Sequence, residues 1–183
     1  MELINWILAG RDLRRNIADS RDRLYRVALA WCGDHALADD LVQETLVLAL
    51  HRSDQLRDKQ RLNAWLYSIL SNCWKQYLRR VRATVELDES DVAAEGDAES
   101  GCCAQETVLQ VRNAILKLPV TQRQTLTLVD LAGFSYAEVA EVLNIPMGTV
   151  MSRLHAARQS LQKTLAQAYS ESPAQTHHLR RVK

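Results

Sequence analysis

Residues 135–161 read SYAEVAEVLNIPMGTVMSRLHAARQSL, and this stretch decides the expected fold. Ser135, followed three residues later by Glu138, has the spacing of a capping box at the start of a helix. Asn144 can adopt the left-handed conformation that ends a helix, and Pro146 presets the backbone for the first turn of the next one. The stretch therefore predicts two helices joined by a tight turn, which is a helix-turn-helix.

The second of these helices has two chemically different faces. At about 100° per residue, one stripe is apolar and forms the expected core side: Val150, Leu154, Ala157, Leu161 and Leu165. The opposite side is small or polar, with two arginines flanking it: Ser152, His155, Ala156, Gln159 and Lys163, with Arg153 and Arg158. Such a face suits the base edges and phosphates of a major groove. The solvated face of a helical bundle has the same periodicity, so this alternative stays open.

The rest of the chain also favours helices. Its 183 residues include only six Gly and three Pro, and no segment alternates strongly between β-branched and polar residues. Apolar periodicity predicts helices from Leu24 to Gly33, over Leu41–Leu50 and from Leu62 onward. In the second half, a helix begins near Val108, and Thr121 with Gln124 predicts another through a second capping box.

An acidic segment separates the two halves. Residues 84–107 contain eight carboxylates and no Lys or Arg: Glu86, Asp88, Glu89, Asp91, Glu95, Asp97, Glu99 and Glu106. This composition is typical of a solvated linker, whose ends would average roughly 25–30 Å apart. We therefore predict an all-α protein in which two small helical domains, residues 1–83 and 108–169, are joined by a flexible acidic linker, residues 84–107. A disordered basic tail follows at residues 170–183.

Cysteine and histidine positions give little sign of an enzyme or a metal site. Cys32 and Cys73 fall on apolar helix faces, where a cysteine is usually a small buried hydrophobe. Cys102 and Cys103, with His177 and His178 in the tail, leave a zinc or redox-sensitive thiol site as an alternative. Adjacent cysteines lack the usual spacing of zinc ligands, and no nucleophile, base and acid stand at usable spacing. We expect no cofactor, no metal and no catalytic residues.

No membrane segment is expected. No apolar run approaches the roughly 18 residues needed to span a bilayer. The first residues, MELINW, lack the charged and apolar regions of a secretion signal. We therefore expect a cytoplasmic protein with no direct membrane insertion.

Two further stretches resemble a known family. Asp39–Thr45, DDLVQET, and Ala64–Asn72, AWLYSILSN, resemble the core-binding and promoter-melting segments of the extracytoplasmic-function (ECF) group of bacterial RNA polymerase sigma factors. The second half, from Leu118 to Leu161 and including GTVMSRL at Gly148–Leu154, is similar to the promoter-binding domain of the same group. The order of the segments also matches. The resemblance implies an alternative sigma factor, not an enzyme, that directs initiation at promoters with -35 and -10 elements and aids DNA melting.

The resemblance implies three sets of contact residues. Binding to core RNA polymerase falls on Asp39, Asp40, Gln43 and Glu44. Contacts to the -10 element and melting fall on Arg57, Lys59, Arg61, Asn72, Lys75, Arg79 and Arg80. Contacts to the -35 element fall on Thr149, Met151, Ser152, Arg153, His155 and Arg158. The implied partners are promoter DNA, the coiled coil of the largest polymerase subunit, the polymerase flap and an anti-sigma factor, and the protein itself is expected to be a monomer.

The chain departs from the family at two of these surfaces. Gln76 stands where family members commonly have Asp, and Met151 where they often have Arg or Lys, so the promoter sequence cannot be copied from other members. We expect Ser152 and His155 to read bases and the two arginines beside them to grip phosphate.

Two questions stay open at this point. Of the two tryptophans near the promoter-melting segment, Trp65 lies in the apolar stripe and is expected in the core, while the role of Trp74 stays open. A stand-alone helix-turn-helix regulator, which would bind duplex DNA as a symmetric dimer, is the alternative function of another class.

Overall fold

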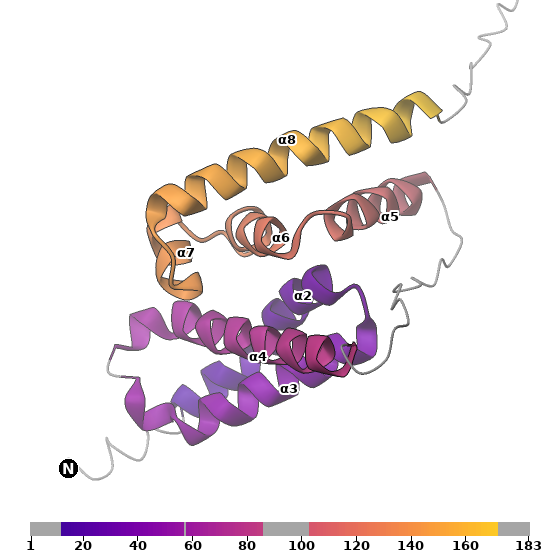
Figure 1. Ribbon diagram of the computed structural model, residues 1–183. Coiled ribbons are helices and arrows are strands. Elements are labelled where there is room, and N and C mark those ends of the chain that lie inside the picture. Colours follow the sequence, from indigo (N-terminus) through magenta and orange to yellow (C-terminus); the bar gives the residue numbers. More distant parts are fainter. Residues whose placement is uncertain (1–11, 57, 86–102, 172–183) are drawn as a thin grey trace, which may run out of the picture.

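The computed structural model describes residues 12–56, 58–85 and 103–171, which are helical with short connections and contain no strand (Figure 1). Arg57, most of the expected linker and residues 172–183 of the expected basic tail lie outside the described residues. In the first half, a helix over residues 12–19 is followed by the other elements: α2 (Arg21–Cys32), α3 (His35–His51), η1 (Ser53–Gln55), η2 (Lys59–Arg61) and α4 (Leu62–Val85). The second half contains α5 (Cys103–Leu116), α6 (Val120–Leu126), a π-helical turn η3 (Thr127–Leu131), α7 (Tyr136–Leu143) and α8 (Met147–Glu171).

Local sequence signals set most of these boundaries. Gly33 ends α2 with φ of 75°, and Asp34 caps α3 by accepting the N–H of Leu37 at 2.8 Å. The capping box predicted at Ser135 and Glu138 is confirmed at the start of α7. Asn144 ends that helix with φ of 54°, as expected from its tolerance of the left-handed region.

The capping box predicted at Thr121 is wrong. Pro119 is the N-cap of α6, and no side chain caps this helix. The Pro119 carbonyl accepts the N–H groups of Gln122 and Arg123, both at 2.9 Å, so the helix begins at Val120. Thr121 therefore lies inside the first turn, where its side chain cannot act as an N-cap.

In the first half, α2, α3 and α4 pack around a common core. Trp31 and Leu24 from α2, Val42 from α3, and Leu66 and Leu70 from α4 are all at most 1% exposed. The helix predicted over Leu41–Leu50 is present, and Leu50 within it is 43% exposed. Nine residues at about 100° each place Leu50 on the opposite side of the helix from Leu41.

The two halves pack directly against each other. Leu128, Phe134, Val139 and Val150 of the second half belong to the same buried cluster as the core of the first half. Figure 1 shows α5 and α6 lying between α8 and the first half, while α7 packs on α4. The sequence predicts two domains and a linker, but it contains no sign that the domains share a core.

Gly33 illustrates how closely the halves approach. A Cβ atom at this position would lie 2.9 Å from the Leu116 side chain of α5. Trp31 Nε1 also donates a buried hydrogen bond of 2.6 Å to Thr127 Oγ1. Arg123 of α6 donates to the carbonyl of Trp31 and, at 3.0 Å, to that of Leu118. Side chains and main chain from both halves therefore join the end of α2 to α6 and η3.

Candidate nucleic-acid interface

The outer face of α8 is the first candidate surface for DNA. Val150, Leu154 and Ala157 are at most 3% exposed, so the stripe predicted as the core side does anchor this helix. Its opposite side is consequently open to solvent. Of the residues predicted for the -35 element, four are exposed and two are half-buried: Met151, Ser152, His155 and Arg158 are exposed, and Thr149 and Arg153 are half-buried.

Two of these side chains have partners of their own. Ser152 Oγ donates to the Thr149 carbonyl at 3.1 Å, a bond within the helix that leaves the hydroxyl on the open face. Arg158 forms a bidentate ion pair with Asp130 of η3. Its Nη2 donates to Oδ1 at 2.6 Å and its Nε donates to Oδ2 at 3.4 Å. The hydrogen bond to Asp130 raises the pKa of the Arg158 guanidinium. Asp130 therefore competes with any DNA phosphate for Arg158.

The second candidate surface lies along α4 and the segment before it. Arg57 falls outside the described residues, and five of the other residues predicted for the -10 element are exposed: Lys59, Arg61, Asn72, Arg79 and Arg80. Lys75 differs, because it is half-buried and its Nζ donates to the Leu143 carbonyl of α7 at 3.2 Å. Burial lowers the pKa of Lys75, and the nearby charges of Arg153 and Arg79 lower it further.

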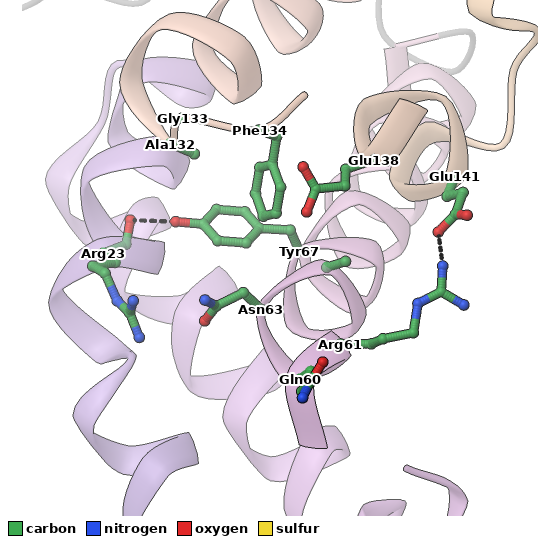
Figure 2. A pocket seen from close by; sticks show the side chains of 11 residues that line it. Arg23, Gln60, Arg61, Asn63, Tyr67, Ala132, Gly133, Phe134, Glu138 and Glu141 are labelled. Carbon is green, nitrogen blue, oxygen red and sulfur yellow. Dashed lines mark hydrogen bonds and ion pairs between the residues drawn. The ribbon is translucent and has the colours of Figure 1, made fainter. Parts of the chain in front are cut away.

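Arg61 also turns toward the second half. It forms an ion pair with Glu141 of α7, and Figure 2 shows the two side chains reaching across from η2 and α7. Both side chains remain more than half exposed, at 59% and 58%. Two of the predicted DNA-binding cations thus contact α7.

A cavity of about 240 Å³ lies between the halves next to this ion pair. Figure 2 shows Tyr67 and Phe134 next to each other among its lining residues, and their rings pack edge to face with centroids 5.0 Å apart. Tyr67 also donates its hydroxyl to the carbonyl of Arg23 at 3.2 Å. Burial raises the pKa of the Tyr67 hydroxyl, so this group stays a neutral donor at physiological pH.

The exposed face of α3 is the candidate surface for a protein partner. Asp40, Gln43 and Glu44 are exposed, whereas Asp39 is paired with Arg21 at 2.6 Å. Val47, 53% exposed, and Leu50 extend the same open side. Neither Val47 nor Leu50 was among the residues predicted to bind core polymerase.

The two tryptophans near the predicted -10 surface, Trp65 and Trp74, differ in how deeply they are buried. Trp74 is 4% exposed and stacks on Tyr77 with centroids 5.6 Å apart, so it is a core residue in this arrangement. Trp65 was expected in the core but is only half-buried, beside Leu56 and Val142 in a second cavity between the halves. Neither ring lies on an open face where a base could stack without a change in packing.

The alternative of a metal or thiol site finds no support in the described residues. No group of three His, Cys, Asp or Glu side chains among them could hold a metal ion. Burial raises the pKa of both Cys32 and Cys73, which disfavours the reactive thiolate. Cys102, His177 and His178 lie outside the described part of the chain. Within that part, no helix is long and apolar enough to cross a membrane.

Comparison with known proteins identifies the family. The model of Sigma-70 region 2 matches residues 17–84, and that of Sigma-70, region 4 matches residues 109–161. The ECF RNA polymerase sigma factor EcfG of Rhodopseudomonas palustris (strain TIE-1) is 36% identical over 153 residues, covering 84% of each chain. The chain belongs to the ECF RNA polymerase sigma factors. The predicted resemblance is confirmed, and this sigma factor is a transcription initiation factor.

Further relatives agree with this assignment. The sigma factor is 32% identical over 143 residues to SigM of Mycobacterium tuberculosis (strain ATCC 25618 / H37Rv), covering 78% of this chain and 71% of SigM. Among solved structures, RpoE of Bartonella quintana, in complex with the anti-sigma factor NepR, matches with a TM-score of 0.72 and 28% identity, over 85% of this chain and 98% of RpoE. CnrH, in complex with the cytosolic domain of CnrY, matches with a TM-score of 0.63 and 25% identity, over 86% of this chain and 89% of CnrH. The all-α fold with a helix-turn-helix in its second half is confirmed.

Proposed function

We propose that this sigma factor binds core RNA polymerase through the open face of α3, reads the -35 element with α8, and contacts and melts the -10 element with α4. The observation that carries the proposal is the division of α8 into a buried apolar stripe and an open polar face. That face offers Ser152 and His155 for base edges, flanked by Arg153 and Arg158 for phosphates. It has the form of a recognition helix in a helix-turn-helix protein.

The α3 surface suits a basic partner. Asp40, Gln43 and Glu44 supply charge and amide groups that can orient a basic coiled coil, such as that of the largest polymerase subunit. Val47 and Leu50 add apolar area next to them, which a protein partner would cover. Asp39, which is paired with Arg21, would add its negative charge to the electrostatic potential of this surface.

Control by an anti-sigma factor belongs to the same proposal. RpoE and CnrH were both solved in complexes, the former with the anti-sigma factor NepR. A similar partner of this sigma factor would bind both halves and hold them away from polymerase. We place this regulation, and the action of the protein as a monomer on core polymerase, in the cytoplasm.

Transcription in vitro tests the proposal directly. Purified protein is mixed with sigma-free core RNA polymerase and a library of genomic promoter fragments, and transcript starts are mapped. Starts that need both proteins are expected, and their upstream sequences give the two promoter elements. A matched reaction with the double variant Ser152→Ala, His155→Ala should lose those starts while still binding core polymerase, because only base reading is removed.

The same experiment distinguishes a sigma factor from a stand-alone helix-turn-helix regulator. A regulator of that kind would protect duplex sites without polymerase and would yield no new starts with it. The open α8 face serves either function, so the discriminating observation is dependence on core polymerase. A chain that protects duplex DNA alone and adds no starts would contradict the proposal.

A further inference from the structure

One apolar side chain lies among the polar residues of the open α8 face. Met151 is 45% exposed, and its neighbours on that side of the helix, Gly148, Ser152 and His155, are exposed as well. Figure 1 shows α8 along the outside of the molecule, with α5 and α6 packed on one side of it. At about 100° per residue, Met151 lies roughly 90° from the middle of the buried stripe. Packing within the protein therefore does not account for this side chain.

The surface next to Met151 is recessed. Gly148, three residues earlier, has no side chain, and a Cβ atom added there would meet nothing within 4 Å. Ser152 is short, and its hydroxyl is folded back onto the Thr149 carbonyl at 3.1 Å. Met151 therefore projects beyond both of these neighbours, and the space beside it has room for a small apolar group.

The chemistry of Met151 limits what it can recognise on DNA. Its thioether has no hydrogen-bond donor and is only a weak acceptor, so it cannot donate to the N7 and O6 atoms of guanine or to the N7 atom of adenine. In the major groove, the C5 methyl group of thymine is the apolar group that a base edge presents. A flexible, polarizable methionine side chain adapts readily to such a group. Of the four bases, Met151 thus matches thymine.

The position of Met151 makes a base edge the expected partner. The recognition helix of a helix-turn-helix protein contacts base edges through its N-terminal residues. Met151 lies in the second turn of α8, which begins at Met147. Ser152 and His155, the residues proposed to read bases, are next to it on the helix surface. A base that either of them contacts therefore has a neighbour within reach of Met151.

We propose that Met151 is a specificity-determining residue of the -35 contact: its side chain packs on the C5 methyl group of one thymine in that element. This inference deepens the proposed function and rests on it for the role of α8. It adds an apolar contact that selects thymine to the hydrogen bonds expected from Ser152 and His155.

Deoxyuridine tests the methyl group by itself, because it pairs as thymine does but lacks the C5 methyl. The probe is the promoter fragment with the strongest mapped start, in which each thymine of the -35 element, on either strand, is replaced in turn. Binding by holoenzyme is measured by fluorescence anisotropy. For the wild type, one replacement should weaken binding about two- to fivefold, the size expected from burying a single methyl group. Met151→Ala should bind that fragment and the original with equal affinity.

Three controls make the result specific to Met151. Met151→Leu keeps an apolar side chain and should keep the dependence on the methyl group. Met147→Ala shortens a methionine that is 49% exposed but lies about 40° nearer the buried stripe, and it should also keep the dependence. Deoxyuridine in the spacer between the two promoter elements should leave binding unchanged, which excludes a general effect on DNA flexibility. Since both methionines are exposed, the variants should fold like the wild type, and circular dichroism checks this.

The outcomes separate this inference from the proposed function. If Met151→Ala still loses affinity with deoxyuridine, another residue contacts the methyl group and the inference is overturned. A wild type that initiates but binds every substituted fragment like the original also overturns it and leaves the proposed function intact, as does a -35 element without thymine on either strand. Unchanged promoter binding by Met151→Ala has the same meaning, and is expected if the side chain contacts a protein partner instead. A wild type that yields no promoter-specific starts removes the proposed function, and the inference falls with it.

Discussion

The two candidate DNA surfaces of this sigma factor differ in how far the fold exposes them to solvent. On α8, the polar residues lie opposite a buried stripe and face solvent, with Ser152 and His155 exposed. On α4, Lys75 is half-buried under α7, and Arg61 is paired with Glu141. The sequence patterns of the two surfaces gave no reason to expect this difference.

The comparison teaches that charge and periodicity identify a surface but do not make it available. The α8 face stays open because its own domain needs only one side of that helix for packing. The α4 surface is covered because a second domain uses it as a packing partner. Substitutions can test how strongly the two halves hold together and whether the exposed face of α8 binds DNA.

The largest effect is expected at Trp31. Trp31→Ala removes a fully buried ring and its hydrogen bond to Thr127, so it should lower the free energy of unfolding by about 3–5 kcal/mol. Urea denaturation followed by circular dichroism measures this. Thr127→Val keeps the ring but removes the hydroxyl, which accepts from Trp31 and donates to the Arg123 carbonyl at 2.9 Å, and should lower it by about 1–3 kcal/mol. Equal stability of Trp31→Ala and wild type would contradict the burial of this ring and its hydrogen bond to Thr127.

A smaller effect is expected at the cap of α7. Ser135→Ala removes the side chain that accepts from the N–H of Glu138, and should cost about 1 kcal/mol in unfolding free energy. Thr at this position is the matched control, because its hydroxyl can cap. Since α7 forms the cover, Ser135→Ala should also speed hydrogen exchange along α7.

The same cap predicts a pH dependence. Hydrogen bonds from the side chain and backbone of Ser135 lower the pKa of Glu138. The stabilisation is therefore present above the unfolded pKa of about 4.3 and is lost as the pH falls through the lower folded pKa. The stability difference between wild type and Ser135→Ala should shrink at acid pH. A difference that stayed constant to pH 2 would assign the cap to another group.

On the open surface, Arg158→Ala tests the role of a flanking arginine. If Arg158 holds phosphate, the variant should weaken binding equally at all promoters and reduce the salt slope by about one. Asp130→Ala is the control, because it removes the carboxylate that pairs with Arg158 but keeps the guanidinium. Promoter binding by holoenzyme at several salt concentrations measures both. A change in preferred bases would instead make Arg158 a base-reading residue.

The smallest effect on stability is expected at Val47. Val47→Ala changes an exposed residue of α3 and should alter the unfolding free energy by less than about 0.5 kcal/mol. If core polymerase covers this side chain, the same variant should weaken that binding by about 1 kcal/mol. Val42→Ala, at a fully buried position of the same helix, should show the reverse pattern. Unchanged affinity for polymerase in Val47→Ala would remove this residue from the proposed interface.

The sequence by itself determined the local structure of this protein. The capping box at Ser135, the helix ends at Gly33 and Asn144, and the apolar stripe of α8 could all be predicted. These features depend on interactions between residues a few positions apart, so their signal is contained in short stretches. The local prediction that failed, the capping box at Thr121, misplaced a helix start.

Only the tertiary structure decided which surface is covered. Trp31 bonds to Thr127 across 96 residues, Arg61 to Glu141 across 80, and Lys75 to Leu143 across 68. Such pairs form because the packing of two surfaces brings the partners together. The sequence around either partner does not indicate which residue it will contact. An arginine or glutamate on an exposed helix face looks the same in sequence whether water, DNA or a second domain lies against it. The docking of α7 on α4 fixes that environment, because apolar area from both halves is buried in one core.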